Sequence, residues 1–307
     1  MRGLFLPAAL LFVALGAEAA NFSSSAIGTT AAGFLNLGAG ARALALGGAY
    51  SAAADDATSL YWNPAAMTQV PKRSLALMHT VYFASSYYDY ASYVHNMGGA
   101  GAFGLGAQYL AFGSINETDE NFQSIGKVAP YDLAASAGYA YKFGSGYDFE
   151  NGFSLGVAGK YIESRLLDTA KTQAVDLGFL SPRFFDDRLR LAAAAQNIGG
   201  TLKYDQKAEP LPTAFRAGAA LRLLPGWLVA VDGVAPRNDR PYVNAGTEYV
   251  LVPGDWWRVA GRAGFSSQNI APSCGLGIGY RGFNVDYAFV LYGELGDVHR
   301  ISLTFNF

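Results

Sequence analysis

The sequence has little charge and almost no cysteine, and both shortages narrow the class of protein. Only 15% of the 307 residues are charged, whereas soluble domains usually carry about a quarter. The single cysteine, Cys274, excludes an internal disulfide. The net charge of −2 gives no electrostatic basis for binding nucleic acid, so we expect no nucleic-acid partner.

Long apolar runs are also missing, except at the very start of the chain. There, Arg2 is followed by an apolar core from residue 4 to residue 15 and by the small-x-small sequence Ala17-Glu18-Ala19. This pattern is typical of a secretory signal peptide, and its core is too short to span a bilayer. We predict a signal peptide over residues 1–19, with an uncleaved anchor as the alternative.

Period-two alternation begins at residue 73. In 131–143, the odd positions are apolar with aromatic ends, and the even positions are small or polar. An exported chain without membrane helices can span lipid only as a closed barrel, because every backbone polar group must be satisfied there. Each alternating segment therefore predicts one strand with a lipid face and a lumen face.

About fourteen such segments follow one another, each near the roughly 9–11 residues that a tilted membrane strand needs. Long connections such as 114–129 largely alternate with short ones such as 281–282, as outer-membrane barrels require. The exceptions are two long inner turns, near 144–151 and 182–187, and a very short first outer loop, near 84–85. We predict an all-β fold, a transmembrane antiparallel β-barrel over residues 73–307. A secreted β-sandwich or a large lipocalin-like barrel is the soluble alternative, but the polar face carries too little charge for a solvated exterior. The predicted segments are 73–83, 86–97, 102–113, 130–143, 152–165, 172–181, 188–198, 211–223, 226–235, 241–251, 255–266, 273–281, 283–291 and 297–307.

Residues 20–72 do not alternate in this way. Residues 42–51 predict one short glycine-rich strand. Asp55 or Asp56 is expected to cap a short helix through Leu60, which Asn63-Pro64 then ends. The segment either enters the barrel as a plug or packs under it as a periplasmic collar, and the sequence leaves both open.

The same segment resembles a known family. The chain resembles the PorV/PorQ family of outer-membrane proteins, which belongs with the FadL-like fourteen-stranded barrels. This resemblance covers essentially the whole mature chain. The residues that carry it are GAGARALALGGAY (38–50), ADDA (54–57), YWNPA (61–65), QNIG (196–199), LPT (211–213) and VDYAF (285–289).

The resemblance implies a protein of the cell outer membrane in contact with its lipid, and two possible roles. PorV-like members serve type IX protein secretion, which implies a secretion-system channel or exported cargo as partner. FadL-like members move hydrophobic ligands through a lumen closed by an N-terminal hatch. A sealed structural barrel is the third reading. The outer loops of this chain are shorter than either pattern suggests.

Three sets of residues are candidates for function, with neither a cofactor nor a metal expected. Lumen-facing charges form either a structural ladder or a selective path. A terminal Phe with aromatic and leucine residues in register resembles the signal that barrel-assembly machinery recognises. The sets are the lumen residues Asp132, Lys160, Asp176, Arg190, Arg216, Arg222, Asp232, Glu248, Arg258, Arg262, Asp286 and Arg300, the plug motif Arg42, Gly47, Gly48, Asp55, Asp56, Tyr61, Trp62, Asn63 and Pro64, and the terminal residues Leu303, Phe305 and Phe307.

We expect no enzyme activity. The three histidines, His79, His95 and His299, show no metal-ligand spacing, and no serine-centred nucleophile motif is present. Outer-membrane barrels that act as lipases, acyltransferases or proteases need a nucleophile with a base and an orienting group within hydrogen-bond reach.

Overall fold

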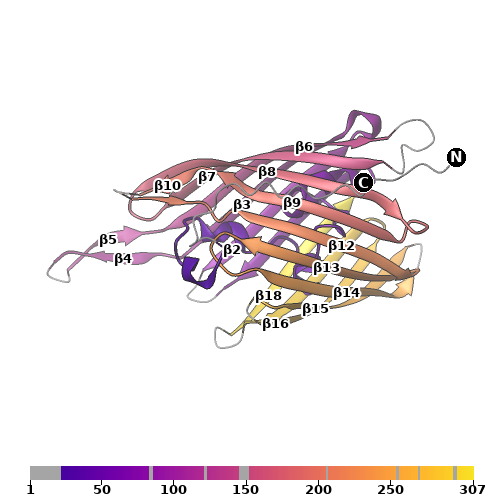
Figure 1. Cartoon of the computed structure of the whole chain (residues 1–307). Helices are drawn as coiled ribbons and strands as arrows, with labels where there is room; N and C mark the ends of the chain where they lie inside the picture. Colours follow the sequence, from indigo (N-terminus) through magenta and orange to yellow (C-terminus); the bar gives the residue numbers. More distant parts are fainter. Residues whose placement is uncertain are drawn as a thin grey trace.

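The computed structural model describes residues 22–82, 86–120, 123–144, 152–204, 207–253, 256–268, 270–292 and 296–307. The predicted signal peptide, residues 1–19, lies outside them. Fourteen antiparallel strands close into one barrel (Figure 1). This confirms the predicted fold class and strand number.

Each barrel strand pairs with its two neighbours around the ring, and β1 closes the barrel by pairing with β18. Next to this seam, the backbone N of Arg73 donates to the carbonyl oxygen of Phe307 at 3.1 Å. The barrel strands are β1 (Arg73–Val81), β2 (Tyr87–Asn96), β3 (Ala102–Ala111), β6 (Tyr131–Phe143), β7 (Phe153–Arg165), β8 (Thr169–Phe184), β9 (Leu189–Gly199), β12 (Ala214–Leu224), β13 (Trp227–Pro236), β14 (Tyr242–Pro253), β15 (Trp257–Ser266), β16 (Ala271–Tyr280), β17 (Phe283–Leu291) and β18 (Asp297–Asn306).

The alternation in sequence becomes an inner and an outer face of the barrel. On β16, every second residue is buried, while Leu276 and Ile278 between them are at least half exposed. Aqueous exposure of so many large apolar side chains is costly, but contact with lipid tails is not. The outer face is therefore suited to contact with the hydrocarbon tails of lipids.

The two ends of the barrel differ in their connections. One end has tight turns, including Arg281-Gly282. Both residues have positive φ angles, 47° at Arg281 and 87° at Gly282, and glycine adopts such angles without steric cost. The other end carries two hairpins, β4 (Ile115–Thr118) with β5 (Ser124–Val128), and β10 (Thr201–Lys203) with β11 (Ala208–Pro210). Figure 1 shows β4–β5 projecting from the end opposite the C-terminus. Since outer-membrane barrels keep short turns in the periplasm, we call these the periplasmic and the long-loop ends.

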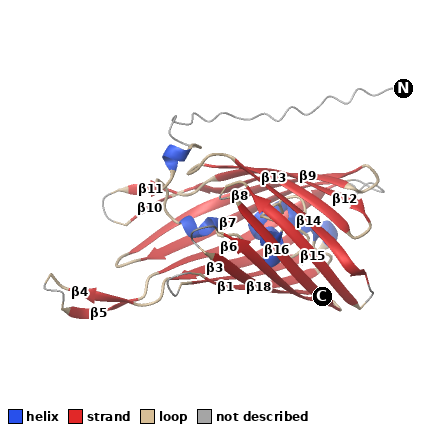
Figure 2. Ribbon diagram, turned by 90° about the horizontal axis from the view of Figure 1, so that it is seen from below, coloured by secondary structure: helices blue, strands red, loops and turns tan. Residues whose placement is uncertain are grey.

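The chain before β1 runs through the barrel from the long-loop end to the periplasmic end. At the long-loop end, the backbone N of Phe22 donates to the oxygen of Arg237 at 2.8 Å. Figure 2 shows helical turns inside the ring of strands. Residues 38–72, which we call the lumen segment, lie within the barrel and pack against its strands. The short helices are η1 (Ser24–Ala26), η2 (Gly33–Asn36), α1 (Ala41–Ala45), α2 (Ser59–Trp62) and η3 (Pro64–Gln69).

Two expectations for this segment are wrong. The strand expected over 42–51 is absent, and α1 covers its start, because this stretch is rich in helix-forming alanine and the closed barrel offers it no free strand edge. Neither Asp55 nor Asp56 is the N-cap of α2, which continues past Leu60 to Trp62. The N-cap is Thr58, and the Asp56 carboxylate instead accepts from the Thr58 backbone N at 2.8 Å. No helix among the described residues has the length and apolar character to cross a membrane.

Candidate functional site: the lumen segment and the cavity beneath it

Aromatic side chains give the lumen segment a core of its own. Tyr50 and Trp62 are almost completely buried, and the Trp62 indole Nε1 donates to the oxygen of Ala39 at 2.7 Å. The rings of Tyr61 and Trp62 meet edge to face with centroids 5.0 Å apart. Burial of each large side chain contributes about 1.5–3 kcal/mol, so this segment is held as a packed unit.

Glycines on the lumen face of the barrel wall let the segment approach closely. Gly246 on β14 and Gly264 on β15 are opposite one another across the ladder. A Cβ atom on either would overlap the backbone at Leu46 and Gly47. The wall and the segment are thus in backbone contact, and two glycines in the wall permit it.

Hydrogen bonds fix the segment to the wall. The Asp232 carboxylate accepts from the backbone N of Tyr50 at 3.2 Å and of Ser51 at 3.0 Å. The Asn63 side-chain amide donates to the oxygen of Phe179 at 3.0 Å. These contacts satisfy buried polar groups that would otherwise each cost about 1–3 kcal/mol.

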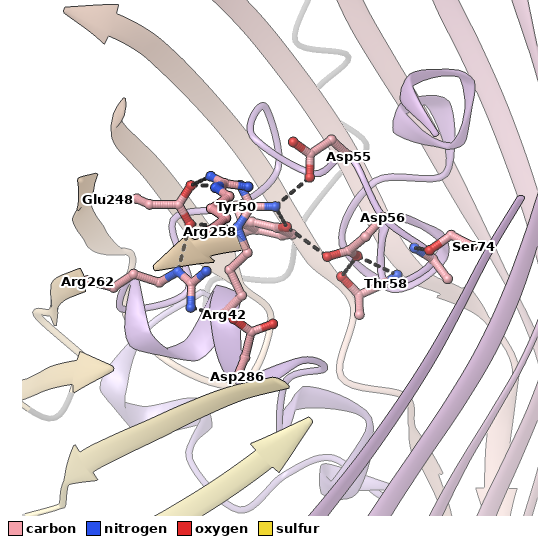
Figure 3. A network of polar contacts seen from close by, with 11 residues as sticks. Arg42, Tyr50, Asp55, Asp56, Thr58, Ser74, Glu248, Arg258, Arg262 and Asp286 are labelled. Atoms are coloured by element: carbon pink, nitrogen blue, oxygen red, sulfur yellow. Dashed lines mark hydrogen bonds and ion pairs between the residues drawn. The ribbon is translucent and has the colours of Figure 1, made fainter. Parts of the chain in front are cut away.

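An ion-pair network centred on Glu248 joins the segment to the wall (Figure 3). Arg42 of α1 donates to the Glu248 carboxylate from Nε at 2.7 Å and from Nη2 at 3.0 Å, and its Nη1 lies 2.5 Å from Asp55 Oδ1. Glu248 also accepts from Arg262 Nε at 2.6 Å and from Arg258 Nη2 at 2.9 Å. One carboxylate therefore holds three guanidinium groups.

The network continues from Arg42 into the segment through Tyr50. The Tyr50 hydroxyl accepts from Arg42 Nη1 at 3.0 Å and donates to Asp56 Oδ2 at 3.1 Å. Burial raises the pKa of Asp56, and repulsion by Asp55 raises it further, while Arg42 opposes both. Burial likewise raises the pKa of the Tyr50 hydroxyl. The protonation of Asp56 therefore depends on its buried setting.

Four of the predicted lumen residues form one ladder. Glu248, Arg258, Arg262 and Asp286 are connected by ion pairs, with Arg262 Nη1 at 2.6 Å from Asp286 Oδ1. The last pair reaches over β16, where a Cβ on Gly277 would collide with both side chains. This glycine therefore makes room for the ion pair.

A second group lies in the wall where the β8–β9 ladder is irregular. Lys160 Nζ lies 2.7 Å from Asp176 Oδ2 and donates to Asn197 Oδ1 at 2.7 Å. Asn197 has a positive φ of 57° and its backbone N donates to Asp176 at 2.7 Å. The pairing register shifts at this point, and a shallow pocket of about 390 Å³ lies beside it.

The remaining predicted lumen residues have separate surroundings. Arg216 stacks over the Trp62 ring at 4.9 Å. Asp132 accepts from the Ser164 hydroxyl near the long-loop end. Arg300 is fully buried and donates to the hydroxyl of Tyr82 at 2.7 Å. The structure thus divides the charges into several groups, and Asp232, described above, bonds the segment itself.

The plug motif and the terminal residues lie in different places. Gly47 and Gly48 have positive φ angles of 68° and 82° after α1, and Asn63 caps η3, which begins at Pro64. Leu303, Phe305 and Phe307 are exposed on the outer face, next to the seam with β1. Recognition of these terminal residues by assembly machinery stays a prediction.

A cavity of about 780 Å³ lies between the lumen segment and the wall at the periplasmic end. Its lining is strongly charged and includes Arg190 and Arg222 from the predicted lumen set, together with Arg183. Sequence reasoning missed Arg183 because it ended this strand at residue 181, whereas β8 continues to Phe184. Among the described residues, no cluster of three or more histidine, cysteine or acidic side chains could hold a metal ion.

The family model described as "Type IX secretion system protein PorV" matches residues 20–226. The chain belongs to the PorV family. The match includes the whole lumen segment and the strands from β1 to β12, and it confirms the resemblance seen in the sequence. No curated protein matches the chain.

Solved structures with the same fold are FadL-like barrels. The Pseudomonas putida toluene transporter TodX is 13% identical, with a TM-score of 0.55 and coverage of 88% of this chain and 99% of that one. The CymD monoaromatic hydrocarbon channel is 14% identical (TM-score 0.57; 88% and 98% covered). A Pseudomonas aeruginosa FadL homologue is 10% identical (TM-score 0.54; 88% and 98% covered). At these identities the likeness concerns the fold of this PorV-family protein.

Proposed function

We propose that this PorV-family barrel is a non-catalytic accessory of protein export or surface attachment in a type IX-like pathway, with residues 20–72 closing its lumen. The observation that carries the proposal is the family match, because it runs continuously through the lumen segment and into the barrel. The partner is an exported protein or a secretion channel in the outer membrane.

The packing of the lumen segment supports a closed barrel. Tyr50 and Trp62 are buried inside it, and Arg42 is tied to Glu248 on the wall. A freely open pore would need these contacts to break. A barrel that works by binding proteins at its rims has no such need.

Passive transport of a hydrophobic small molecule is the second candidate, and one observation favours it. The shallow pocket beside the β8–β9 irregularity lies on the outer face, where Tyr161 and Val175 are exposed. On the lumen side, however, the buried Lys160–Asp176 ion pair closes the same place. The larger cavity is lined by many charged groups, which disfavours an apolar solute.

Deletion of the gene in its native host distinguishes the candidates. We expect exported proteins to accumulate in the periplasm and to be lost from the cell surface, with recovery when the intact chain is restored. Affinity purification after cross-linking should then recover cargo or a large secretion channel. Normal surface cargo together with reduced uptake of an aromatic hydrocarbon would favour transport. If the deletion alters neither surface cargo nor uptake, the remaining candidate is a sealed structural barrel.

A further inference from the structure

Three arginines come together on the wall of the periplasmic cavity. Arg183 on β8 is the direct cross-strand partner of Arg190 on β9. Arg190 is opposite Ala220 on β12, and Arg222 follows two residues later on the same face. All three arginines line the cavity of about 780 Å³. Side chains directly opposite in an antiparallel pair have Cβ atoms about 5 Å apart, so the register forces these cations close together.

The three guanidinium groups form no ion pair with a carboxylate among the described residues, although Asp186 and Asp187 in the following turn also line the cavity. Asp55 and Asp187 attract Arg183 and Arg190 only at longer range than an ion pair. The acids on the opposite wall are already engaged, since Glu248 binds three arginines. Like charges directly opposite one another in a sheet are destabilising.

Arg190 is held in place with part of its binding capacity unused. Its Nη1 donates to the side-chain oxygen of Gln69 in the lumen segment. Its Nε is buried and has no hydrogen-bond partner. A fixed guanidinium with a free, buried donor is suited to a planar or tetrahedral oxyanion, which accepts several N–H groups at once.

We propose that Arg183, Arg190 and Arg222 form an oxyanion site that binds a phosphate or carboxylate group entering the barrel from its periplasmic end. The group belongs either to a free periplasmic anion or to the headgroup of an anionic phospholipid. The site goes beyond the proposed role in export, because it requires neither cargo nor a secretion channel.

Titration calorimetry on the full mature protein in zwitterionic detergent tests the site, with inorganic phosphate as the probe and ionic strength held constant. We expect saturable binding that Arg190→Gln and Arg222→Gln each weaken about tenfold or more, since each removes a charge-assisted contact. Arg222 is exposed, so Arg222→Gln should leave folding intact. Arg281→Gln is the matched control, because Arg281 lies at the same end but stacks on Trp256 outside the cavity.

The same variants in nanodiscs with and without phosphatidylglycerol identify the source of the anion. Retention of phosphatidylglycerol in native mass spectra that depends on Arg190 and Arg222, without binding of phosphate, assigns the site to a lipid headgroup. Phosphate binding with the same dependence assigns it to a free anion. Binding of neither probe, or an equal loss in Arg281→Gln, would overturn the site.

Discussion

Arg42 and Glu248 lie 206 residues apart in the sequence and meet inside the barrel through two hydrogen bonds, of 2.7 and 3.0 Å. Both side chains are largely buried, and Glu248 also binds Arg258 and Arg262 (Figure 3). The lumen segment is therefore tied to β14 and β15 by a single carboxylate. Loss of that carboxylate would leave Arg258 without an ion-pair partner among the described residues, and Arg42 and Arg262 with one carboxylate each.

Glu248→Gln should lower the free energy of unfolding by about 3–5 kcal/mol, because it breaks a buried ion pair and leaves its partners charged. Urea unfolding in detergent micelles, followed by tryptophan fluorescence, measures the change. Glu209→Gln is the control, since Glu209 Oε1 lies 3.6 Å from Nζ of the exposed Lys207. Loss of this surface ion pair should lower the free energy of unfolding by about 0–1 kcal/mol. Equal stability of the two variants would show that Glu248 does not anchor the segment.

Gly246→Val should open the barrel without unfolding it. The new side chain would occupy the space of the Leu46 backbone, so the lumen segment must leave its place. Single-channel recording in planar bilayers should show a closed wild-type protein and a conducting variant. Gly233→Val on the neighbouring strand is the control, because its Cβ would meet only the Ala217 oxygen at an ordinary 3.8 Å.

A variant that remains closed while its barrel still resists heat in gel electrophoresis would contradict this account of the segment. Removal of residues 20–72 gives the upper limit of conductance. If this truncated barrel is also closed, the wall charges alone seal the lumen, and transport through it is excluded.

Asp56 should make stability depend on pH. Its pKa is raised in the folded state, chiefly by burial and further by Asp55, so the folded protein binds the proton more tightly than the unfolded chain does. The free energy of unfolding should therefore fall as the pH rises from about 4, the ordinary pKa, through the folded-state pKa, and then level off. Asp56→Asn should lose this decline.

The informative quantity is the difference in unfolding free energy between wild type and Asp56→Asn across the pH range. Arg42 and Asp55 act on Asp56 electrostatically and Tyr50 donates a hydrogen bond to it, and all three remain in both proteins. A difference that does not change with pH would mean that Asp56 titrates as it does in the unfolded chain.

The barrel could be predicted from sequence because its determinant is local. Leu276 and Ile278 alternate with glycines on β16, and such alternation fixes which face meets lipid whatever the rest of the chain does. The prediction of a strand over 42–51 was wrong because no strand edge is available to pair with that stretch: every barrel strand is already paired on both sides. The helical turn at Ala41–Ala45 satisfies its backbone internally instead.

The candidate site was predictable only in part, for a related reason. Glu248, Arg262 and Asp286 could be placed on the lumen face from alternation, but their partners could not. The pairing of Arg42 with Glu248 depends on the path of the lumen segment, which glycines at Gly246 and Gly264 permit. The Arg183–Arg190 pair depends on a register shift in β8–β9, which has no local signal in the sequence.

The path of the N-terminal chain predicts which side of the membrane its start faces. Phe22 is hydrogen-bonded to Arg237 at the long-loop end, and Ser25 nearby is exposed. In outer-membrane barrels the long loops face outward. A cysteine at Ser25, in a Cys274→Ser background, should therefore react in intact cells with a maleimide that cannot cross membranes.

Gly99→Cys is the matched control for this labelling, because Gly99 is exposed in the turn η4 (Gly98–Ala100) at the periplasmic end and its Cβ would meet no atom within 4 Å. It should react only after the cells are broken. Labelling of Gly99→Cys but not of Ser25→Cys in intact cells would reverse the orientation. Labelling of neither until lysis would mean that the start of the chain is not at the surface, and that the segment enters the lumen from the periplasm instead.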